Sequence, residues 1–462
     1  MIPSYRISIA LAGTTLAFGV ACRDVTVPNF NSPSVDALTS SPTPSVVNTA
    51  TSGMLVLYRS AASVEGWQMG SFGRESYNLL QAEARDLLGF YVGPIVPGGF
   101  AQDLGWSNAY TSLRQAQAIR TAVEKVTGYS AAQKEAVTGF VQTMVAMELL
   151  RQIKIRDTVG LVVDIPSDPH ILGAVLGKDA VLARIADMLD SARTHLQNGG
   201  AAFPFALTSG FAGLNTPATF LQLNRGMKAR VDLYRKQWQQ VLTDLATSFI
   251  DTTSGSAATL AKGAYNVWST ASGDSPNPLY DPTPTALYVH PSIISDAQKR
   301  SDGSPDLRVT RKTAPGTVRS LLGVTGTTKF TIYASQSDPT PILKNEELIL
   351  MRAEANFQLG NKTAALADVN FIRINSGGLA PLPSTFTGDM ITEILYNRTY
   401  SLLFEQGTRW VDARRYGRLA QLPKANLGAI GELIFPYVMF PDAECIQRNQ
   451  QPAIGCTQVP GT

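Results

Sequence analysis

Amphipathic helical segments recur along this chain and constrain its fold more than any other feature. Apolar residues return at helical spacing in residues 106–113, 137–145 and 181–196. Residues 227–249 and 348–372 each contain two such stripes separated by a short turn, which is the pattern of a helix–turn–helix pair. Unrelated amphipathic helices in one core would explain any single pair, but several pairs favour a repeat scaffold. We therefore predict a mostly α fold: a tetratricopeptide-like scaffold of helix pairs with long irregular loops and a few short strands.

Two stretches interrupt the helical pattern. Residues 251–340 are rich in Ser, Thr, Gly, Pro and Asp, and the prolines between positions 276 and 284 exclude a long helix there. Residues 65–105 form a shorter stretch of the same kind that carries several aromatic residues. Because a long run without periodicity is usually functional surface, we expect loop insertions near 65–105 and 251–340. Both would belong to a single domain that spans residues 35–462.

Composition and charge exclude several classes of function. The chain has 39 Lys and Arg against 36 Asp and Glu, and no basic run, so it lacks the electrostatic footprint of a nucleic-acid-binding protein. It has three Cys and three His but no CxxC pair and no HExxH motif, although a three-His site assembled from distant segments stays open. A P-loop, a GxGxxG motif and a GxSxG elbow are also missing. We therefore predict no metal, no cofactor and no catalytic site.

The first residues have the form of an export signal. Arg6 is the only charge before a short apolar run, and small residues then lead to Cys22. The run is too short for a permanent transmembrane helix, and no later stretch reaches the necessary length. The Ala21-Cys22 junction resembles a bacterial lipobox, so we expect residues 1–21 to be a signal peptide and residues 22–34 a lipidated tether. Cleavage after Ala21 without acylation, which would release a free protein, is the alternative.

Export would place the two remaining cysteines, Cys445 and Cys456, in an oxidising compartment. They form an even pair once Cys22 carries lipid, and a bridge between them would close a short loop in a tail that is poor in regular structure. We therefore predict a disulfide between Cys445 and Cys456, with two buried free thiols as the alternative.

Four stretches of the sequence have the order and spacing of known motifs. They are the tether Pro28-Asn29-Phe30-Asn31-Ser32-Pro33, the helix Leu350-Met351-Arg352-Ala353-Glu354-Ala355, the signature Glu405-Gln406-Gly407-Thr408-Arg409-Trp410-Val411-Asp412, and the closing Phe440-Pro441 with Glu444 and Asn449. As a set, which runs over almost the whole chain, they resemble the SusD/RagB family of outer-membrane nutrient-binding lipoproteins. Asn397, Gln406 and Ala413 depart from the family's signature pattern.

The resemblance implies a function without catalysis. The protein would capture an oligosaccharide, or a peptide, and act as the lid of a SusC-like TonB-dependent outer-membrane transporter. It would be anchored in the cell outer membrane by lipid on Cys22, exposed at the cell surface, and would need no cofactor. Two other classes of protein stay open, namely an exported glycoside hydrolase and a periplasmic repeat scaffold that binds only proteins.

Glu405 and Asp412 are the acids that a hydrolase reading would use as its pair of carboxylates. Several arginines surround them in the sequence, and so many guanidinium groups would keep both carboxylates ionised, which is wrong for a general acid. We therefore interpret the signature as a structural ion-pair network, in which Gly407 takes the left-handed conformation that ends a helix.

The resemblance also implies where a ligand binds. In the family, contacts come chiefly from two regions that correspond here to residues 65–105 and about 260–300. Helical periodicity stops in both regions while aromatic residues persist, and a loop aromatic would have no core to fill. The predicted ligand-binding residues are Arg85, Asp86, Phe90, Tyr91, Phe100, Tyr265, Trp268 and Tyr280. The alternative is that these rings merely pin their own loops.

If the rings bind ligand, alanine at Tyr91 or Trp268 should weaken binding roughly tenfold while leaving thermal stability nearly unchanged.

Overall fold

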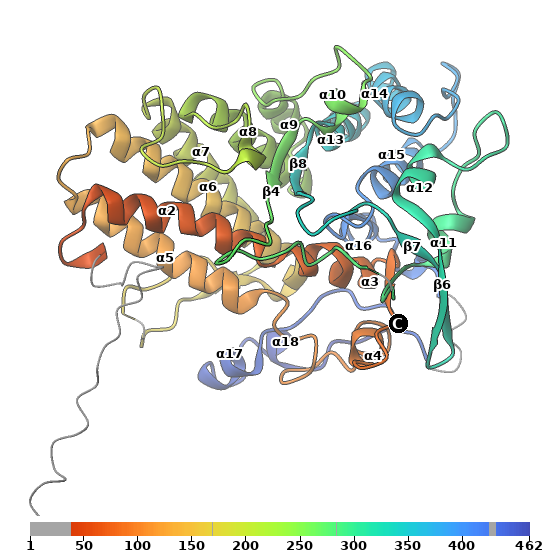
Figure 1. Ribbon diagram of the computed structural model, residues 1–462, viewed down its shortest axis with the longest axis horizontal. Coiled ribbons are helices and arrows are strands. Elements are labelled where there is room, and N and C mark those ends of the chain that lie inside the picture. The colour runs from red at the N-terminus through yellow and green to blue at the C-terminus, as the bar shows by residue number, and fades with distance from the viewer. Residues whose placement is uncertain (1–37, 169, 283, 425–430) are drawn as a thin grey trace, which may run out of the picture.

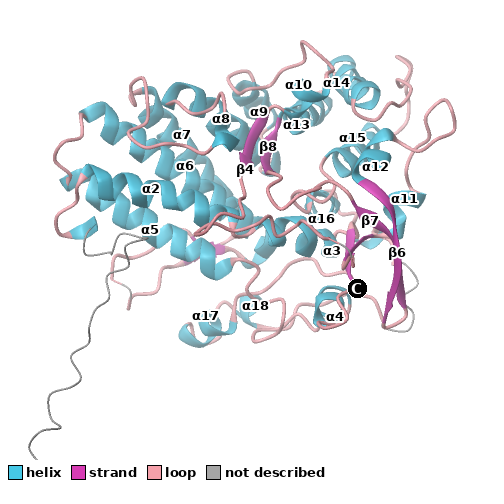
Figure 2. Ribbon diagram, in the orientation of Figure 1, coloured by secondary structure: helices cyan, strands magenta, loops and turns pink. Residues whose placement is uncertain are grey.

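The computed structural model describes residues 38–168, 170–282, 284–424 and 431–462. Long helices form one side of the molecule, and a sheet with shorter helices forms the other (Figure 1). Helices dominate and strands are few and mostly short, which confirms the predicted fold class (Figure 2). The predicted signal peptide, the tether and Cys22 lie outside the described residues. None of the helices in the described part of the chain combines the length and apolar character that crossing a membrane requires.

The scaffold consists of helices that pack against their neighbours along the chain. The helix α6 lies between α5 and α7, and α8 packs on both α7 and α9, while α13 packs on α14. The predicted amphipathic stripes all fall on these helices. Their bounds are α2 (Pro44–Arg59), α5 (Trp106–Lys125), α6 (Ala131–Arg156), α7 (Lys178–Gln197), α8 (Pro217–Tyr234), α9 (Trp238–Leu245), α13 (Asn345–Gln358) and α14 (Lys362–Asn375).

Local sequence sets where the two central scaffold helices begin. Before α6, the Ser130 hydroxyl accepts from the backbone N–H of Gln133 while the Gln133 side chain accepts from the backbone N–H of Ser130. Thr216 and Thr219 form the same reciprocal pair before α8, and Pro217 occupies the first helical position. Such capping satisfies backbone donors that a helix start otherwise leaves unpaired.

The strands of the described residues form three antiparallel sheets. One sheet has four strands in the order β1-β5-β7-β6, and the pairs β2-β3 and β4-β8 form the other two. The strands are β1 (Ser76–Asn78), β2 (Leu161–Val162), β3 (Val175–Leu176), β4 (Gly263–Asn266), β5 (Leu287–Val289), β6 (Thr313–Leu321), β7 (Val324–Phe330) and β8 (Thr340–Lys344). The shorter helices are α3 (Met69–Phe72), α4 (Arg85–Tyr91), α10 (Ala257–Ala261), α11 (Pro291–Ser295), α12 (Leu307–Lys312), α15 (Met390–Ser401), α16 (Thr408–Arg415), α17 (Asp442–Gln447) and α18 (Ala453–Cys456).

Residues 65–105 and 251–340 are more regular than predicted. Between residues 251 and 340 the chain forms β4 to β7, and β6 and β7 are joined by a two-residue turn in which Leu322 and Gly323 both have positive φ. The first stretch contains a π-helical turn (Val64–Gln68), α3, β1 and α4. Most of these elements are short and give too few residues for a periodic pattern to emerge, while the longer strands β6 and β7 are the exception.

Buried apolar residues form two large clusters. The scaffold cluster lies between the long helices and includes Phe140, Met144 and Leu150. The second cluster joins segments that are far apart in the sequence, with Trp67 and Phe90 from the first interrupted stretch, Tyr288 from β5 and Trp410 from α16. We call it the second core.

Candidate functional site

The pairing of β1 with β5 brings the two predicted ligand-binding regions together. Ser76 pairs with Val289 and Asn78 with Leu287. The backbone N–H of Leu79 then donates to the carbonyl of Ala286 at 2.8 Å, so the loop after β1 runs beside the loop before β5. Strands far apart in the sequence therefore place residues 80–86 beside residues 280–282 and 284–286.

Three of the predicted residues reach solvent at this place. Arg85 is exposed, and its Nε donates to Oε1 of Glu83 at 2.7 Å. The guanidinium carbon of Arg85 lies 5.0 Å from the centroid of the Phe100 ring, and Phe100 is 41% exposed. Asp86 is half-buried beside them. We call Leu80, Glu83, Arg85, Asp86 and Phe100 the candidate surface.

Asp86 sits at the edge between this surface and the core. Its Oδ2 accepts from Nδ2 of Asn78 at 2.9 Å. Burial, and after it the charge of Glu83, raise the pKa of Asp86 to about 6. A carboxyl group with this pKa can accept hydrogen bonds near neutral pH and can donate one in mild acid. The candidate surface thus offers an apolar ring, a guanidinium and a carboxyl group within a few residues.

Phe90 and Tyr91, in contrast, belong to the second core, so the exposure on which their prediction as ligand contacts depended is wrong. Both are almost fully buried. Phe90 packs edge-on against Phe72 at 5.2 Å between centroids. The Tyr91 hydroxyl donates to the carbonyl of Ser76 at 2.6 Å, and its ring lies 4.4 Å from the guanidinium of Arg74. These loop rings do have a core to fill, because distant segments supply one.

Trp268 is also buried, so its predicted exposure is wrong as well. Its Nε1 donates to Oγ1 of Thr340 at 3.3 Å, and the guanidinium of Arg59 lies 5.2 Å from its ring. Tyr265, on β4, is half-buried and donates its hydroxyl to the carbonyl of Ala261. Figure 1 shows β4 well apart from α4, so Tyr265 does not join the candidate surface. Trp268 contributes no exposed ring to that surface, because it is buried.

The burial of Tyr91 and Trp268 reverses the expected effect of replacing them. Alanine at either position removes packed contacts, so the variants should lose stability rather than ligand affinity.

Tyr280 is half-buried in the loop that runs beside residues 79–86.

The sequence interpretation missed Leu80, Glu83 and Asn78. Leu80 is 38% exposed, and Glu83 and Asn78 hold the side chains of Arg85 and Asp86 in place. Residues 79–86 contain no aromatic ring, so a prediction based on aromatic residues does not point to them. The available signal was the run Glu83-Ala84-Arg85-Asp86, in which three charged residues stand within four positions shortly after Leu79-Leu80.

The signature acids lie in ion pairs, as the structural interpretation predicts. Asp412 binds Nε of Arg398 at 2.6 Å and Nη2 of Arg415 at 2.8 Å. Burial raises the pKa of Asp412, but the two guanidinium groups outweigh burial and hold it below its ordinary value. Glu405 accepts from Nζ of Lys344 at 2.7 Å and from Nζ of Lys312 at 3.2 Å. Both carboxylates are buried among cations, an arrangement that stabilises a fold and does not suit a proton donor.

Gly407 is left-handed as predicted, with φ +57°, but it precedes α16 and does not end a helix. Around it, the buried carboxyl group of Glu75 accepts from the backbone N–H of Phe404 at 3.0 Å and of Arg409 at 3.2 Å. Burial raises the pKa of Glu75 to about 7 despite these bonds. Trp410 follows, stacked on Phe72 at 4.8 Å between centroids. The signature therefore locks α16 onto the segment that carries β1.

A disulfide stabilises the C-terminal segment. Cys445 and Cys456 form a disulfide with their Cα atoms 5.5 Å apart, which joins α17 to α18. Within the described ranges, no three His, Cys, Asp or Glu side chains gather in a way that could hold a metal ion. His290 is buried against Ser292, and His195 binds Glu135.

Comparison with known proteins agrees with this architecture. Residues 295–459 match the model of the SusD family. No curated protein sequence matches the chain.

Solved structures share the fold over most of the chain. A SusD superfamily protein from Bacteroides vulgatus has TM-score 0.65 and 14% identity, over 88% of this chain and 98% of that one. Surface glycan-binding protein A from Bacteroides thetaiotaomicron, in complex with laminarihexaose, has TM-score 0.64 and 12% identity, over 90% and 99% of the two chains. A SusD-like carbohydrate-binding protein from Bacteroides fragilis has TM-score 0.63 and 12% identity, over 92% and 95%.

Proposed function

Because the chain belongs to the SusD/RagB family, we propose that it is a non-catalytic protein of the cell surface that binds an oligosaccharide. The candidate surface is the observation that carries this proposal for the chain itself. Sugars are bound by an apolar face that stacks on the ring and by a few polar groups that bond the hydroxyls. Phe100 supplies such a face, and Arg85 and Asp86 supply such groups. Two structural relatives are described as a glycan-binding and a carbohydrate-binding protein.

Catalysis is not part of the proposal. Glu405 and Asp412, the acids that a hydrolase would need, are buried in ion pairs with lysine and arginine side chains. Capture needs neither a proton donor nor a metal. The binding test also includes peptides, because the Phe100 ring beside the opposite charges of Arg85 and Asp86 suits a peptide as well.

Titration of wild-type protein and variants tests this function. Laminarihexaose and the strongest ligand from an oligosaccharide array are the probes, with a peptide library as the second arm. We expect Phe100→Ala to weaken binding roughly tenfold, since stacking on an aromatic ring is worth on the order of 1 kcal/mol. Arg85→Ala should weaken binding in the same direction. Thermal unfolding should barely change, because both side chains are exposed.

Leu359→Ala is the matched control, since Leu359 is 39% exposed on the scaffold and lies outside the candidate surface. It should bind the ligand like wild type. If Phe100→Ala also binds like wild type, the ligand lies elsewhere. Release of new reducing ends from the glycan would favour the exported hydrolase instead.

The proposal includes anchoring and a partner. Residues 1–21 would be removed as a signal peptide, and acyl chains on Cys22 would attach the tether 22–34 to the outer membrane. More than one chain is needed for firm attachment. The domain 35–462 would then close over a SusC-like TonB-dependent transporter. Mass spectrometry of the mature N-terminus should find acylated Cys22, whereas an unmodified Cys22 in a freely diffusing product contradicts anchoring. Co-purification from membranes with a large barrel protein tests the partner.

A further inference from the structure

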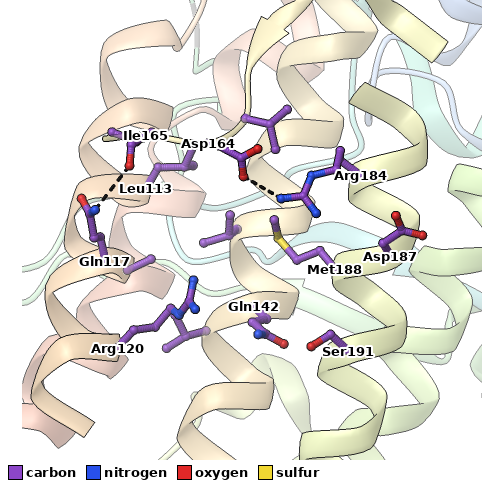
Figure 3. A pocket seen from close by; sticks show the side chains of 14 residues that line it. Leu113, Gln117, Arg120, Gln142, Asp164, Ile165, Arg184, Asp187, Met188 and Ser191 are labelled. Carbon is purple, nitrogen blue, oxygen red and sulfur yellow. Dashed lines mark hydrogen bonds and ion pairs between the residues drawn. The ribbon is translucent and has the colours of Figure 1, made fainter. Parts of the chain in front are cut away.

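A cavity of about 350 Å³ lies within the scaffold. Its walls come from α5, α6 and α7, and residues 163–165 cross one end (Figure 3). These helices lie on the opposite side of the molecule from α4, which carries the candidate surface (Figure 1). We call this space the scaffold cavity.

The scaffold cavity is closed at one end before any ligand arrives. Arg184 of α7 binds Oδ1 of Asp164 at 2.6 Å. From the facing wall, Nε2 of Gln117 on α5 donates to the carbonyl of Ile165 at 3.3 Å. The segment 164–165 therefore contacts both walls, and the cavity is present in the structure without a ligand, as small-molecule sites usually are.

The lining combines an apolar floor with polar walls. Leu113, Val141, Val145 and Met188 contribute the apolar part, and all of them belong to or pack on the scaffold cluster. On the polar side, Oε1 of Gln142 is buried and accepts no hydrogen bond within the described residues. The walls are therefore not purely apolar, as those of a core void would be. They also contain a polar atom whose hydrogen-bonding capacity the described residues leave unused.

Positive charge on α5 and α7 faces this space. In Figure 3 the guanidinium groups of Arg120 and Arg184 point into the cavity from opposite walls. Arg184 has Asp164 as its partner, but Arg120 binds no carboxylate among the described residues. Asp187 also lines α7, yet its carboxylate is turned away from Arg120 in Figure 3. Arg120 is exposed, so its guanidinium faces the cavity from the rim, in contact with solvent and without a carboxylate partner among the described residues.

We propose that the scaffold cavity binds a small organic monocarboxylate, separately from the glycan at the candidate surface. The carboxylate pairs with Arg120, whose planar guanidinium can bind both of its oxygens. The body of the ligand rests on Val141, Val145 and Met188. A single uncompensated guanidinium fits one negative charge better than the two of a phosphate, which would need more donors. The volume suits a molecule of the size of a sugar acid or a medium-chain fatty acid.

Two carboxylates and their uncharged counterparts test this proposal. The mature chain is titrated with hexanoate and glucuronate, and with 1-hexanol and glucose, and binding is followed by calorimetry and by nuclear magnetic resonance. We expect one carboxylate to bind saturably, at least about tenfold more tightly than its neutral counterpart, because an ion pair with a guanidinium is among the stronger hydrogen-bonded contacts. Which of the two binds tells whether the body is apolar or hydroxylated.

Matched variants tie the binding to the cavity. Arg120→Gln should weaken carboxylate binding about tenfold or more, whereas Arg193→Gln, which removes an exposed charge of α7 outside the lining, should leave it unchanged. Neither variant should change thermal unfolding. Equal binding by Arg120→Gln and wild type would overturn the proposal, and so would saturable binding of neither carboxylate. Phe100→Ala should leave carboxylate binding intact, so the two sites can fail independently.

Discussion

Asp412→Asn is expected to lower the free energy of unfolding by about 3–5 kcal/mol, which is the usual cost of removing one partner of a buried ion pair. The substitution keeps the size of the side chain but removes its charge. Arg398 has no exposed surface, and two of its three nitrogens lack a hydrogen-bond partner within the described residues. Its charge would stay buried without the carboxylate 2.6 Å away. The charge of Arg415 would remain better compensated, because Arg415 also binds Glu354 at 2.7 Å.

An exposed pair provides the control for this prediction. Asp164 binds Arg184 at the same distance of 2.6 Å, but 70% and 46% of the two side chains are exposed. Asp164→Asn should therefore cost less than about 1 kcal/mol. Chemical denaturation of both variants measures the contrast. Equal losses for the two would show that the Asp412 pair stabilises no more than a surface pair does.

The difference in unfolding free energy between wild type and Asp412→Asn should change with pH in one direction. The pKa of Asp412 is lower in the folded protein than its ordinary value of about 4. The stabilisation that its charge brings is then fully present above that ordinary value and is lost as pH falls through the lower, folded-state pKa. Wild type and Asp412→Asn should therefore differ most at neutral pH and converge in strong acid.

Helix pairs were predictable because their information is local. The stripe at residues 181–196 needs no distant partner to be recognised, and it falls on α7. The strands β6 and β7 carry no comparable signal. Their turn uses Leu322-Gly323, where both residues need positive φ, a geometry for which Asn-Gly is the common sequence. With Leu322 at the first turn position, the sequence lacks the usual signal of a hairpin.

The sequence marked two stretches that the fold brings side by side, but not which of their residues reach solvent. Residues 65–105 and 260–300 do meet, through the pairing of β1 with β5. Which rings face solvent depends on contacts that no local pattern contains. Tyr91 is buried because Arg74 and Ser76 fold over it, while Phe100 stays half-exposed at the rim. Burial in the second core is a property of several distant segments together.

Gly407→Ala should destabilise the protein by about 3 kcal/mol or more, because two costs add at this residue. Its φ of +57° is left-handed, which costs a residue with a Cβ roughly 1–2 kcal/mol. The new Cβ would also overlap the Cβ of Met69 and lie 3.0 Å from the Met69 carbonyl carbon. Met69 begins α3, and neither it nor α16 can yield without moving Trp410 from Phe72.

Gly417→Ala separates these two costs. Gly417 follows α16 with a φ of +66°, close to that of Gly407, but nothing lies within 4 Å of where its Cβ would be. This variant should lose only the conformational part, roughly 1–2 kcal/mol. The difference between the two variants, measured by chemical denaturation, is the cost of pushing α16 away from α3. Similar losses at both positions would mean that this contact yields readily and that the signature glycine serves backbone conformation alone. A larger loss at Gly407 would show that the signature needs glycine because two helices meet there without room for a side chain.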